Sequence, residues 1–394
     1  MSEWKKYSLG KFAEINPRVS LKQGNEYSFV EMKDLDAMHK YVSPSARKGL
    51  KGGSKFENGD TLFARITPCL ENGKICQVKN LENNLGFGST EFLVFRGKKD
   101  ISDTDFVYYL TKTDYVRNNA VQMMTGTSGR QRVEKSALEN LEILAPDLPT
   151  QTQIASILTS FDDKIELLGQ MNQTLETMAQ TIFKEWFVDF NFPGFDGELV
   201  DGVPKGWKVL DLGCISTLIA GGDKPKNTSL QQNEQYKVPI YSNGITNEGL
   251  YGFTDTSRIF EESVTVSARG TIGYVCLRLK PYVPIVRLIG VIPKQEFVSA
   301  KYLYFWLKTQ NISGTGTTQQ QLTIPDFQRF KILVPHMELI NQFTLIMNSF
   351  FNKIEKNKIQ IRTLAHLRDA LLPKLMSGKV KINTDVSHYD VRNS

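Results

Sequence analysis

Two long segments of the chain repeat one arrangement of hydrophobic and polar positions. In both, hydrophobic residues recur in alternating steps of three and four, which is the spacing of a helix that packs along one face. At about 1.5 Å per residue, a helix from Gln151 to Trp186 would be on the order of 50 Å long. The first segment carries Leu158, Phe161, Ile165, Leu168, Leu175 and Ile182, and the second carries Ile346, Phe350, Ile354, Ile361, Leu364 and Leu371.

These segments belong to an internal repeat. Glu142–Ile165 aligns without a gap with Lys331–Ile354, and the identical positions share one spacing, as between Ile143 and Ile332 (332 − 143 = 189). Upstream, "FVYYLTKT" echoes "YLYFWLKT", "TLFAR" echoes "TVSAR", and "WKKYSLG" echoes "WKVLDLG". Self-similarity at a nearly fixed spacing is typical of duplicated units. The chain is therefore expected to hold two copies of one module.

Each copy predicts a globular part ahead of its helix. Runs such as "TLFARI", "TEFLVF", "VTVSA" and "YVCLRL" are typical of strands, and "TDFVYYLTKTDYVRNN" and "SAKYLYFWLKTQN" of helices, between Gly- and Asn-rich turns. This mixture indicates an α+β fold. We expect two pseudo-symmetric mixed α/β domains separated by an antiparallel pair of long coiled-coil helices. The expected segments are domain 1 (1–146), helical spacer 1 (147–190), domain 2 (191–335), helical spacer 2 (336–380) and a C-terminal tail (381–394).

Details of the two helices follow from single polar residues. Thr150 and Gln153, just after Pro149, predict a capping box at the start of the first helix. The hydrophobic stripes are interrupted by Asn172 and Asn357. Pairing positions whose numbers sum to 529 would set these two asparagines opposite each other, and a buried Asn can fix helix register. The alternative is that both asparagines lie at the solvent-exposed rim of the helix pair and do not contact each other.

Composition narrows the class of protein. A content of 40% hydrophobic and 23% charged residues over 394 residues is typical of a globular chain of two or more domains. No apolar run approaches the ~18 residues of a membrane helix, which predicts a cytoplasmic protein with no membrane partner. The four cysteines are scattered without a CxxC pair, so no metal site is predicted. The net charge of +6 permits a polyanionic partner without requiring one.

No catalytic constellation stands out in the sequence. It has no GxxxxGKS/T phosphate loop, no HExxH and no GxSxG motif, and "NFPG" at Asn191 lacks the second proline of an amino-methyltransferase motif. None of the four histidines has a titratable partner at a spacing useful for catalysis, so each is expected to be a surface or cap residue. We predict a protein that is not an enzyme. The alternatives are a self-contained DNA-modifying enzyme with an unrecognised motif and a coiled-coil scaffold that binds other proteins.

Basic and amide side chains gather in loops of both copies. Arg and Lys can neutralise phosphates and read guanine, while Gln and Asn can bridge adenine. One such loop alone would be a solvated turn, but "TGTSGRQR" and "GTGTTQQQ" occupy matching places in the two copies. Two modules held apart suit duplex DNA, whose major groove recurs on one face every ~34 Å. The candidate DNA-binding residues in these loops are Arg47, Lys48, Lys51, Lys55, Arg130, Gln131, Arg132, Lys224, Lys226, Gln319, Gln320 and Gln321.

Arg65 and Arg269 complete the candidate set. Each ends a strand-like run at an "AR" step before a turn that contains Gly or Pro. Either side chain could contact a base or a phosphate. Either could instead pair internally with an acid such as Glu91.

Taken in order, these segments resemble the specificity subunit of type I restriction-modification systems. The resemblance covers essentially the entire chain and is carried by "WKVLDLG", "ARGTIG", the loops "GTSGRQR" and "GTGTTQQQ", and "ILAPDLPTQTQIASILTSFDDKI" with its echo. It implies a non-catalytic DNA reader with two target-recognition domains, each contacting one half of an asymmetric bipartite target. It also implies that the helices set the gap and dock two methyltransferase subunits, which motor-nuclease subunits join for cleavage.

The same resemblance implies that the chain itself carries no cofactor. S-adenosylmethionine would belong to the methyltransferase, which flips the target adenine out of the stack, and ATP and magnesium are likewise expected on partner subunits. For partner docking and helix pairing we expect Gln153, Ile157, Phe161, Ile165, Leu168, Asn172, Gln342, Ile346, Phe350, Ile354, Asn357 and Ile361.

Overall fold

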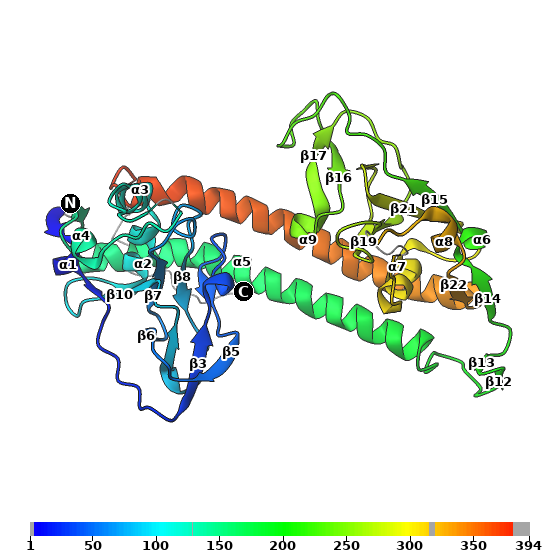
Figure 1. Cartoon of the computed structure of the whole chain (residues 1–394), viewed down its shortest axis with the longest axis horizontal. Helices are drawn as coiled ribbons and strands as arrows, with labels where there is room; N and C mark the ends of the chain where they lie inside the picture. Colours follow the sequence, from blue (N-terminus) through cyan, green and yellow to red (C-terminus); the bar gives the residue numbers. More distant parts are fainter. Residues whose placement is uncertain (1–3, 128, 315–319, 381–394) are drawn as a thin grey trace, which may run out of the picture. The chain divides into compact units, whose positions relative to one another are not determined.

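The computed structural model of the chain describes residues 4–127, 129–314 and 320–380 (Figure 1). These residues divide into two compact units. Unit 1 runs as far as Gln170 and resumes at Asn357, and unit 2 is Met171–Lys356. Each unit thus contains its own sheets and a part of both long helices. The expected tail, 381–394, lies outside the described residues.

Unit 1 is built on three sheets. A five-stranded sheet has the order β2-β10-β7-β8-β4, a four-stranded sheet has the order β5-β3-β9-β6, and β1 pairs with β11. In the four-stranded sheet, β3 is antiparallel to β5 and parallel to β9. The elements are β1 (Lys5–Ser8), α1 (Leu9–Phe12), β2 (Ala13–Ile15), β3 (Glu26–Val30), η1 (Met32–Asp34), β4 (Tyr41–Val42), β5 (Ala46–Gly49), β6 (Ser54–Glu57), β7 (Thr61–Ala64), β8 (Ile75–Val78), η2 (Glu82–Asn84), β9 (Leu85–Gly88), β10 (Phe92–Gly97), α2 (Thr104–Lys112), α3 (Asp114–Gln122), α4 (Lys135–Glu139), β11 (Glu142–Ala145) and the start of α5 (Leu148–Phe187).

The five-stranded sheet is the middle layer of unit 1, because successive residues of its strands face opposite sides. Phe63 and Leu93 lie in the core that the sheet shares with α2, α5 and α9. Leu62 and Phe92, one position away on each strand, lie in a second core with Phe56 of the four-stranded sheet. Helices therefore cover one face of this sheet, and the four-stranded sheet covers the other.

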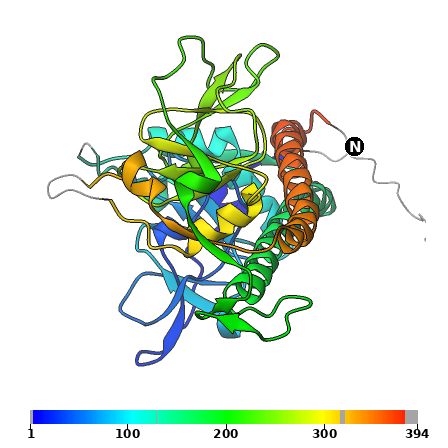
Figure 2. The same cartoon turned by 90° about the vertical axis from the view of Figure 1, so that its right-hand side faces the viewer.

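Unit 2 repeats most of this topology, with one strand fewer in each of its two larger sheets. Its sheets have the orders β15-β21-β18-β19 and β17-β16-β20, with β14 paired to β22 and β12 to β13. As β3 does in unit 1, β16 pairs with one antiparallel and one parallel neighbour. Figure 2 shows the two larger sheets of unit 2 beside the orange helix α9. The elements are β12 (Leu199–Val200), β13 (Val203–Pro204), β14 (Lys208–Asp211), α6 (Leu212–Ile215), β15 (Ser216–Ala220), β16 (Val238–Tyr241), η3 (Thr246–Gly249), β17 (Leu250–Thr254), β18 (Ser263–Ser267), β19 (Val275–Arg278), β20 (Val283–Pro284), β21 (Leu288–Pro293), α7 (Ala300–Thr309), α8 (Ile324–Gln328), β22 (Lys331–Val334) and α9 (Met337–Leu375).

The long helices α5 and α9 run antiparallel within each unit. In unit 1, Asp162 of α5 bonds to Arg368 of α9, and earlier α5 residues share a core with later α9 residues. In unit 2, the rings of Phe187 and Phe343 lie 5.1 Å apart. Rising residue numbers on α5 therefore meet falling numbers on α9. The predicted fold class, two mixed α/β domains with an antiparallel pair of long helices, is confirmed.

The start of α5 differs from the sequence prediction. The helix begins at Leu148, and the Asp147 carboxylate accepts a hydrogen bond from the Thr150 N–H at 3.1 Å. The predicted capping box at Thr150 and Gln153 was wrong. Pro149 lies inside the first turn, where its missing N–H would have no helical acceptor. The cap therefore lies before the proline and not after it.

A buried polar network joins both long helices to α2 and to Lys40, the residue before β4, in unit 1. The Asp162 carboxylate is 3% exposed and accepts hydrogen bonds from Arg368 and from the Tyr109 hydroxyl, both at 2.5 Å. Lys40, also buried, donates to Asp105 at 2.9 Å and to Thr159 of α5 at 2.6 Å. Buried charges are tolerated when they are paired and hydrogen-bonded. The network therefore holds α2, α5 and α9 in one arrangement.

Candidate nucleic-acid interface

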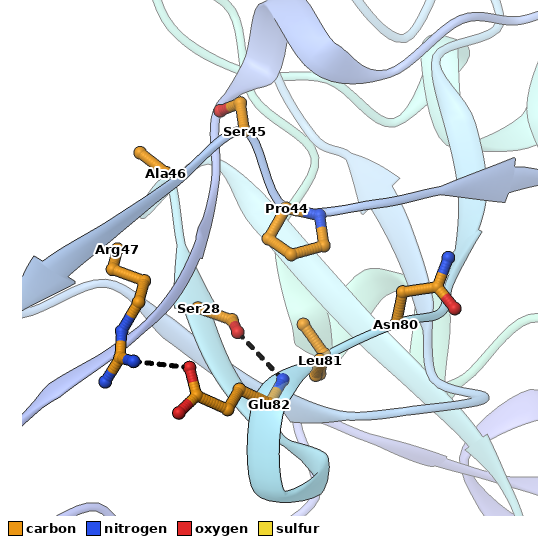
Figure 3. Close-up of a pocket in the computed structure, with 8 residues that line it drawn as sticks. All are labelled: Ser28, Pro44, Ser45, Ala46, Arg47, Asn80, Leu81 and Glu82. Carbon is orange, nitrogen blue, oxygen red and sulfur yellow. Dashed lines mark hydrogen bonds and ion pairs between the residues drawn. The ribbon is translucent and has the colours of Figure 1, made fainter.

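The first candidate surface lies on the four-stranded sheet of unit 1. Arg47 and Lys48 extend from its edge strand β5, where Arg47 reaches Glu82 at 2.5 Å and Lys48 reaches Glu31 at 2.7 Å. Figure 3 shows the Arg47 pair beside a shallow hollow that includes Ser28. Lys33 and Lys48 bond to Glu31 and lower its pKa to about 2. Arg47 and Lys48 are thus already paired with acids of unit 1.

A second hollow lies at the loop between β5 and β6. Its lining includes Phe29, Phe87, Lys48 and Lys51, and the Lys48 ammonium lies 4.0 Å from the centre of the Phe29 ring. In the described part of the chain, Lys51 and the β6 residue Lys55 form no ion pair. The close turn requires glycine, because a side chain on Gly53 would meet the carbonyl oxygen of Gly88. The hollow therefore has Lys48 and Lys51 beside the rings of Phe29 and Phe87.

The second candidate surface in unit 1 gathers at the ends of β7 and β10. Arg65 pairs with Glu134 at 2.8 Å. Arg132 bonds through both Nε and Nη2 to Glu91, with its shortest contact at 2.6 Å, and this bonding raises the pKa of the Arg132 guanidinium. Arg65 is therefore paired internally, which was one of its two expected states. Its acid is Glu134 and not Glu91, because Arg132 occupies the Glu91 carboxylate.

Arg130 and Gln131 complete this cluster. Gln131 is held by its backbone, which exchanges hydrogen bonds with Thr67 at 3.0 and 3.1 Å. Arg130 is exposed and, among the residues that the structure describes, forms no ion pair. The two candidate surfaces of unit 1 meet at the turn after β9, since Thr90 lines the lysine hollow and Glu91 holds Arg132.

The matching cluster in unit 2 carries fewer acids. Leu322, next to the exposed Gln321 and Gln320, donates its N–H to the carbonyl of Ala268 at 2.9 Å. This bond brings the two glutamines beside Arg269, whose side chain is partly exposed and forms no ion pair within the described residues. The third glutamine of this loop, Gln319, lies outside the described residues.

The remaining predicted contacts of unit 2 lie in the loop after β15. Lys224 and Lys226 are both exposed, and the Lys224 ammonium lies 4.9 Å from the ring centre of Tyr251. Gly222, two positions before Lys224, forms a bridge with Ile285. The loop therefore lies against the turn between β20 and β21.

The strand register corrects one match between the copies. Arg65 donates its N–H to Glu91 and accepts from Val133, at 3.0 and 2.9 Å. In unit 2, Ala268 makes the same two bonds, to Arg287 and from Leu322, at 2.8 and 2.9 Å. The residue of unit 2 that matches Arg65 is therefore Ala268. The match with Arg269, which the shared "AR" step had suggested, was wrong.

The same register shows two residues that the sequence reasoning missed, Glu91 as the partner of Arg132 and Arg287 as the counterpart of Glu91 in unit 2. The spacing of the internal repeat could have related these two residues to each other. The spacing between "FVYYLTKT" and "YLYFWLKT" (302 − 106 = 196) also relates Glu91 to Arg287 (287 − 91 = 196). The sequence had suggested Glu91 only as a partner of Arg65 or Arg269, and the repeat is what relates it to Arg287.

The expected helix residues divide by burial. Ile165, Leu168, Ile354 and Asn357 are at most 3% exposed. Gln342 is exposed. Asn172 and Asn357 fall on opposite sides of the boundary between the units, so their pairing stays a prediction. The residues of intermediate burial are Gln153, Ile157, Phe161, Asn172, Ile346, Phe350 and Ile361.

These features define a duplicated α+β protein with one basic, amide-rich loop surface in each copy. Among the described residues, no helix combines the length and apolar character that crossing a membrane requires. The family model described as type I restriction modification DNA specificity domain matches residues 1–177 and 204–363. The chain belongs to this family of specificity subunits, which is non-catalytic.

Relatives extend over the whole chain. The type I restriction enzyme HindI specificity subunit of Haemophilus influenzae is 27% identical over 96% of this chain and all of that protein. The MjaIX specificity subunit of Methanocaldococcus jannaschii is 28% identical over 93% of this chain and 90% of that protein. The crystal structure of a type I restriction-modification S subunit from M. genitalium covers 95% of this chain and 96% of its own, with 17% identity and a TM-score of 0.59. This last similarity concerns the fold.

Proposed function

We propose that the chain reads an asymmetric, bipartite DNA target, with one half bound by each target-recognition domain. The proposed domains are residues 1–146 and 191–335, and the proposed spacers are 147–190 and 336–380. One observation carries the proposal: the two copies share the strand order β2-β10-β7-β8 and β15-β21-β18-β19, while the side chains at matching loop positions differ, as Arg132 and Gln321 do. Arg suits guanine and Gln suits adenine, so matching positions favour different half-sites.

The proposed interface combines two kinds of contact. Lysines on the sheet edge of unit 1 and in the loop after β15 would neutralise phosphates and position the duplex. Side chains near the strand ends would reach base edges: Arg65, Arg130, Gln131 and Arg132 in unit 1, and Arg269, Gln320 and Gln321 in unit 2. Gln319, outside the described residues, is proposed as a base contact from its sequence alone. Arg65 and Arg132 would have to read bases from within their ion pairs with Glu134 and Glu91, which hold the two guanidinium groups in fixed positions.

We also propose that the two helices set the gap between the half-sites and dock two methyltransferase subunits. Cleavage would require additional restriction subunits. On this proposal S-adenosylmethionine, ATP and magnesium all bind to the partners. Met178 and Leu367 are exposed apolar side chains at equivalent positions of the two copies (367 − 178 = 189), which makes them candidates for this docking.

The test is to express the chain with its own methyltransferase subunit and map methylated adenines across a genome. The expected result is one motif with two unlike halves and a gap of fixed length. A contiguous motif, or methylation without sequence preference, would contradict the proposal. Purified chain that modifies or cuts DNA alone would favour the enzyme alternative. DNA binding that is insensitive to salt would favour the scaffold alternative, because phosphate contacts weaken with salt.

A further inference from the structure

The turn that follows the parallel strand of the second sheet carries opposite charges in the two units. In unit 1 this turn lies between β9 and β10 and holds Glu91, and in unit 2 it lies between β20 and β21 and holds Arg287. The carbonyl of each residue accepts the N–H at the end of the neighbouring strand, from Arg65 in unit 1 and from Ala268 in unit 2. The two residues therefore occupy one structural position.

The charge difference changes the surroundings of that position. In unit 1, the Glu91 carboxylate binds Arg132, and Arg65 is bound by Glu134, so the acids balance these two arginines. In unit 2, the positions of Arg132 and Glu134 hold Gln321 and Thr323. Arg287 is exposed, and it forms no ion pair within the described part of unit 2. At this position unit 2 thus has the unpaired cation Arg287, within its described part, whereas unit 1 has the ion pair of Glu91 and Arg132.

The backbone gives an independent reason to examine Arg287. Its φ angle is +74°, in the left-handed region that side chains with a Cβ rarely adopt. Glycine or asparagine would take this conformation at lower cost. A solvated surface arginine has no need of a strained position, and residues held in such positions cluster at binding sites.

Other residues of the same surface are also basic. Arg258 is exposed and its guanidinium lies against Gly222, and Gly222 bridges to Ile285 of the Arg287 turn. Arg269 follows Ala268, the residue that binds the Arg287 carbonyl. The turn therefore stands within a group of cations beside Gln320 and Gln321.

We propose that Arg287 is a phosphate contact of the second target-recognition domain, and that Glu91 removes the equivalent contact from the first by holding Arg132. This inference rests on the proposed DNA-reading function and assigns unequal electrostatic roles to the two half-sites. In unit 2, Arg287 adds a phosphate contact whose contribution to DNA affinity weakens with salt. In unit 1, Glu91 at the same position orients Arg132 toward a base. The sequence-independent part of binding comes from phosphate contacts, so Arg287 acts on all duplexes alike.

The experiment measures DNA affinity against salt for the full chain in complex with its methyltransferase subunits. Two labelled duplexes of equal length are used, one with the mapped target and one without. For Arg287→Gln, the affinity ratio of wild type to variant should fall by about 3.5-fold between 50 and 200 mM salt, which corresponds to one lost phosphate contact. The loss should be equal on the two duplexes. Glu91→Gln should make the DNA affinity of the complex fall more steeply with salt than that of the wild type, because the substitution releases Arg132 for a phosphate contact.

Two further variants separate binding from folding. Arg287→Gly should weaken DNA binding as Arg287→Gln does while unfolding at the same or a higher temperature, since glycine relieves the left-handed strain. Val286→Ser, at the neighbouring exposed position, should leave both slope and affinity unchanged.

Three outcomes would overturn the inference. The first is an unchanged salt slope for Arg287→Gln, and the second is a loss confined to the target duplex, which would make Arg287 a base reader. An unaltered slope for Glu91→Gln would remove the role given to Glu91. Failure of the proposed function looks different, because the wild-type complex would then not distinguish the two duplexes.

Discussion

At the scale of single residues, the burial of Asp162 and Arg368 is the feature with the largest expected effect on stability. Arg368 is 9% exposed and Asp162 only 3%, and each is the principal charged partner of the other. Removing one member of a buried ion pair leaves an uncompensated charge. The second copy has Phe351 at the position of Asp162 and Ala179 at that of Arg368, both in the apolar core of unit 2.

We predict that Asp162→Asn lowers the free energy of unfolding of unit 1 by about 3–5 kcal/mol, the usual cost of breaking a buried pair. The triple variant Asp162→Leu, Arg368→Met and Tyr109→Phe would remove both charges and the tyrosine hydroxyl together, and should regain most of this loss. Hydrogen exchange of unit 1 amides measures the effect.

The exposed pair of Lys184 and Asp189 supplies the control for that prediction. Asp189→Asn should change stability by no more than about 1 kcal/mol, because exposed pairs contribute little. If Asp162→Asn and Asp189→Asn lowered the free energy of unfolding equally, burial would not be the reason for the contribution of the Asp162–Arg368 pair.

Burial also separates the four cysteines. Cys76 and Cys276 are buried, and burial raises the pKa of both thiols, that of Cys76 to about 11. Thiolates are the reactive form, so these two should be inert at about pH 8, near the pKa of a free thiol. We predict that a maleimide labels exposed Cys214 fastest and half-buried Cys69 more slowly, as counted by mass spectrometry. Labelling of Cys76 in the native protein before Cys214 would contradict the burial.

At the scale of elements, the repeat predicted the strands and helices well because it samples each element twice. The runs that begin "TLFARI" and "VTVSA" became β7 and β18, and "SAKYLYFWLKTQN" became α7. The helix seam was read less completely. Leu158, Ile165 and Leu168 are buried as expected, but so is Asp162, which hydrophobic periodicity cannot detect because its burial depends on Arg368 in the other long helix.

Ion pairs in the candidate interface were equally hidden from the sequence. Arg65 meets Glu134, and Arg132 meets Glu91, across loops whose approach depends on sheet register. Periodicity fixes which face a side chain takes, but not which distant loop lies beside it. The basic loops could therefore be predicted, whereas the pairing within them could not.

The helix surfaces carry one further matched feature. Met178 on α5 and Leu367 on α9 occupy equivalent positions of the two copies and are 46% and 45% exposed. If each docks one methyltransferase, polar substitution at one site should remove one partner and leave the other. Neither Met178 nor Leu367 belongs to the buried core of its unit.

We predict that Met178→Gln or Leu367→Gln alone changes the assembly from two methyltransferase subunits per chain to one, measured by native mass spectrometry. The double variant should bind none tightly. Gln180→Ala, on a different side of α5, serves as the control and should keep both subunits. Loss of both partners from either single variant would contradict independent docking sites.

At the scale of the whole molecule, the duplicated architecture makes the two half-sites separable. Each unit, and with it each proposed target-recognition domain, has its own sheets, and the clusters of buried residues in unit 1 and unit 2 share no member. Side chains that read bases in one domain therefore do not depend on the packing of the other. Sequence changes in residues 191–335 should act on one half of the DNA target alone.

We predict that replacing residues 191–335 by the matching segment of a relative changes one half of the methylated motif and keeps the other half and the gap. The reciprocal replacement of residues 1–146 should change only the other half. The gap should persist in both exchanges, because both long helices are retained. Mapping methylated adenines for the two chimaeras measures all three elements of the motif. If one exchange alters both halves, the domains read DNA jointly, and if the gap changes, the spacing is set within the domains and not by α5 and α9.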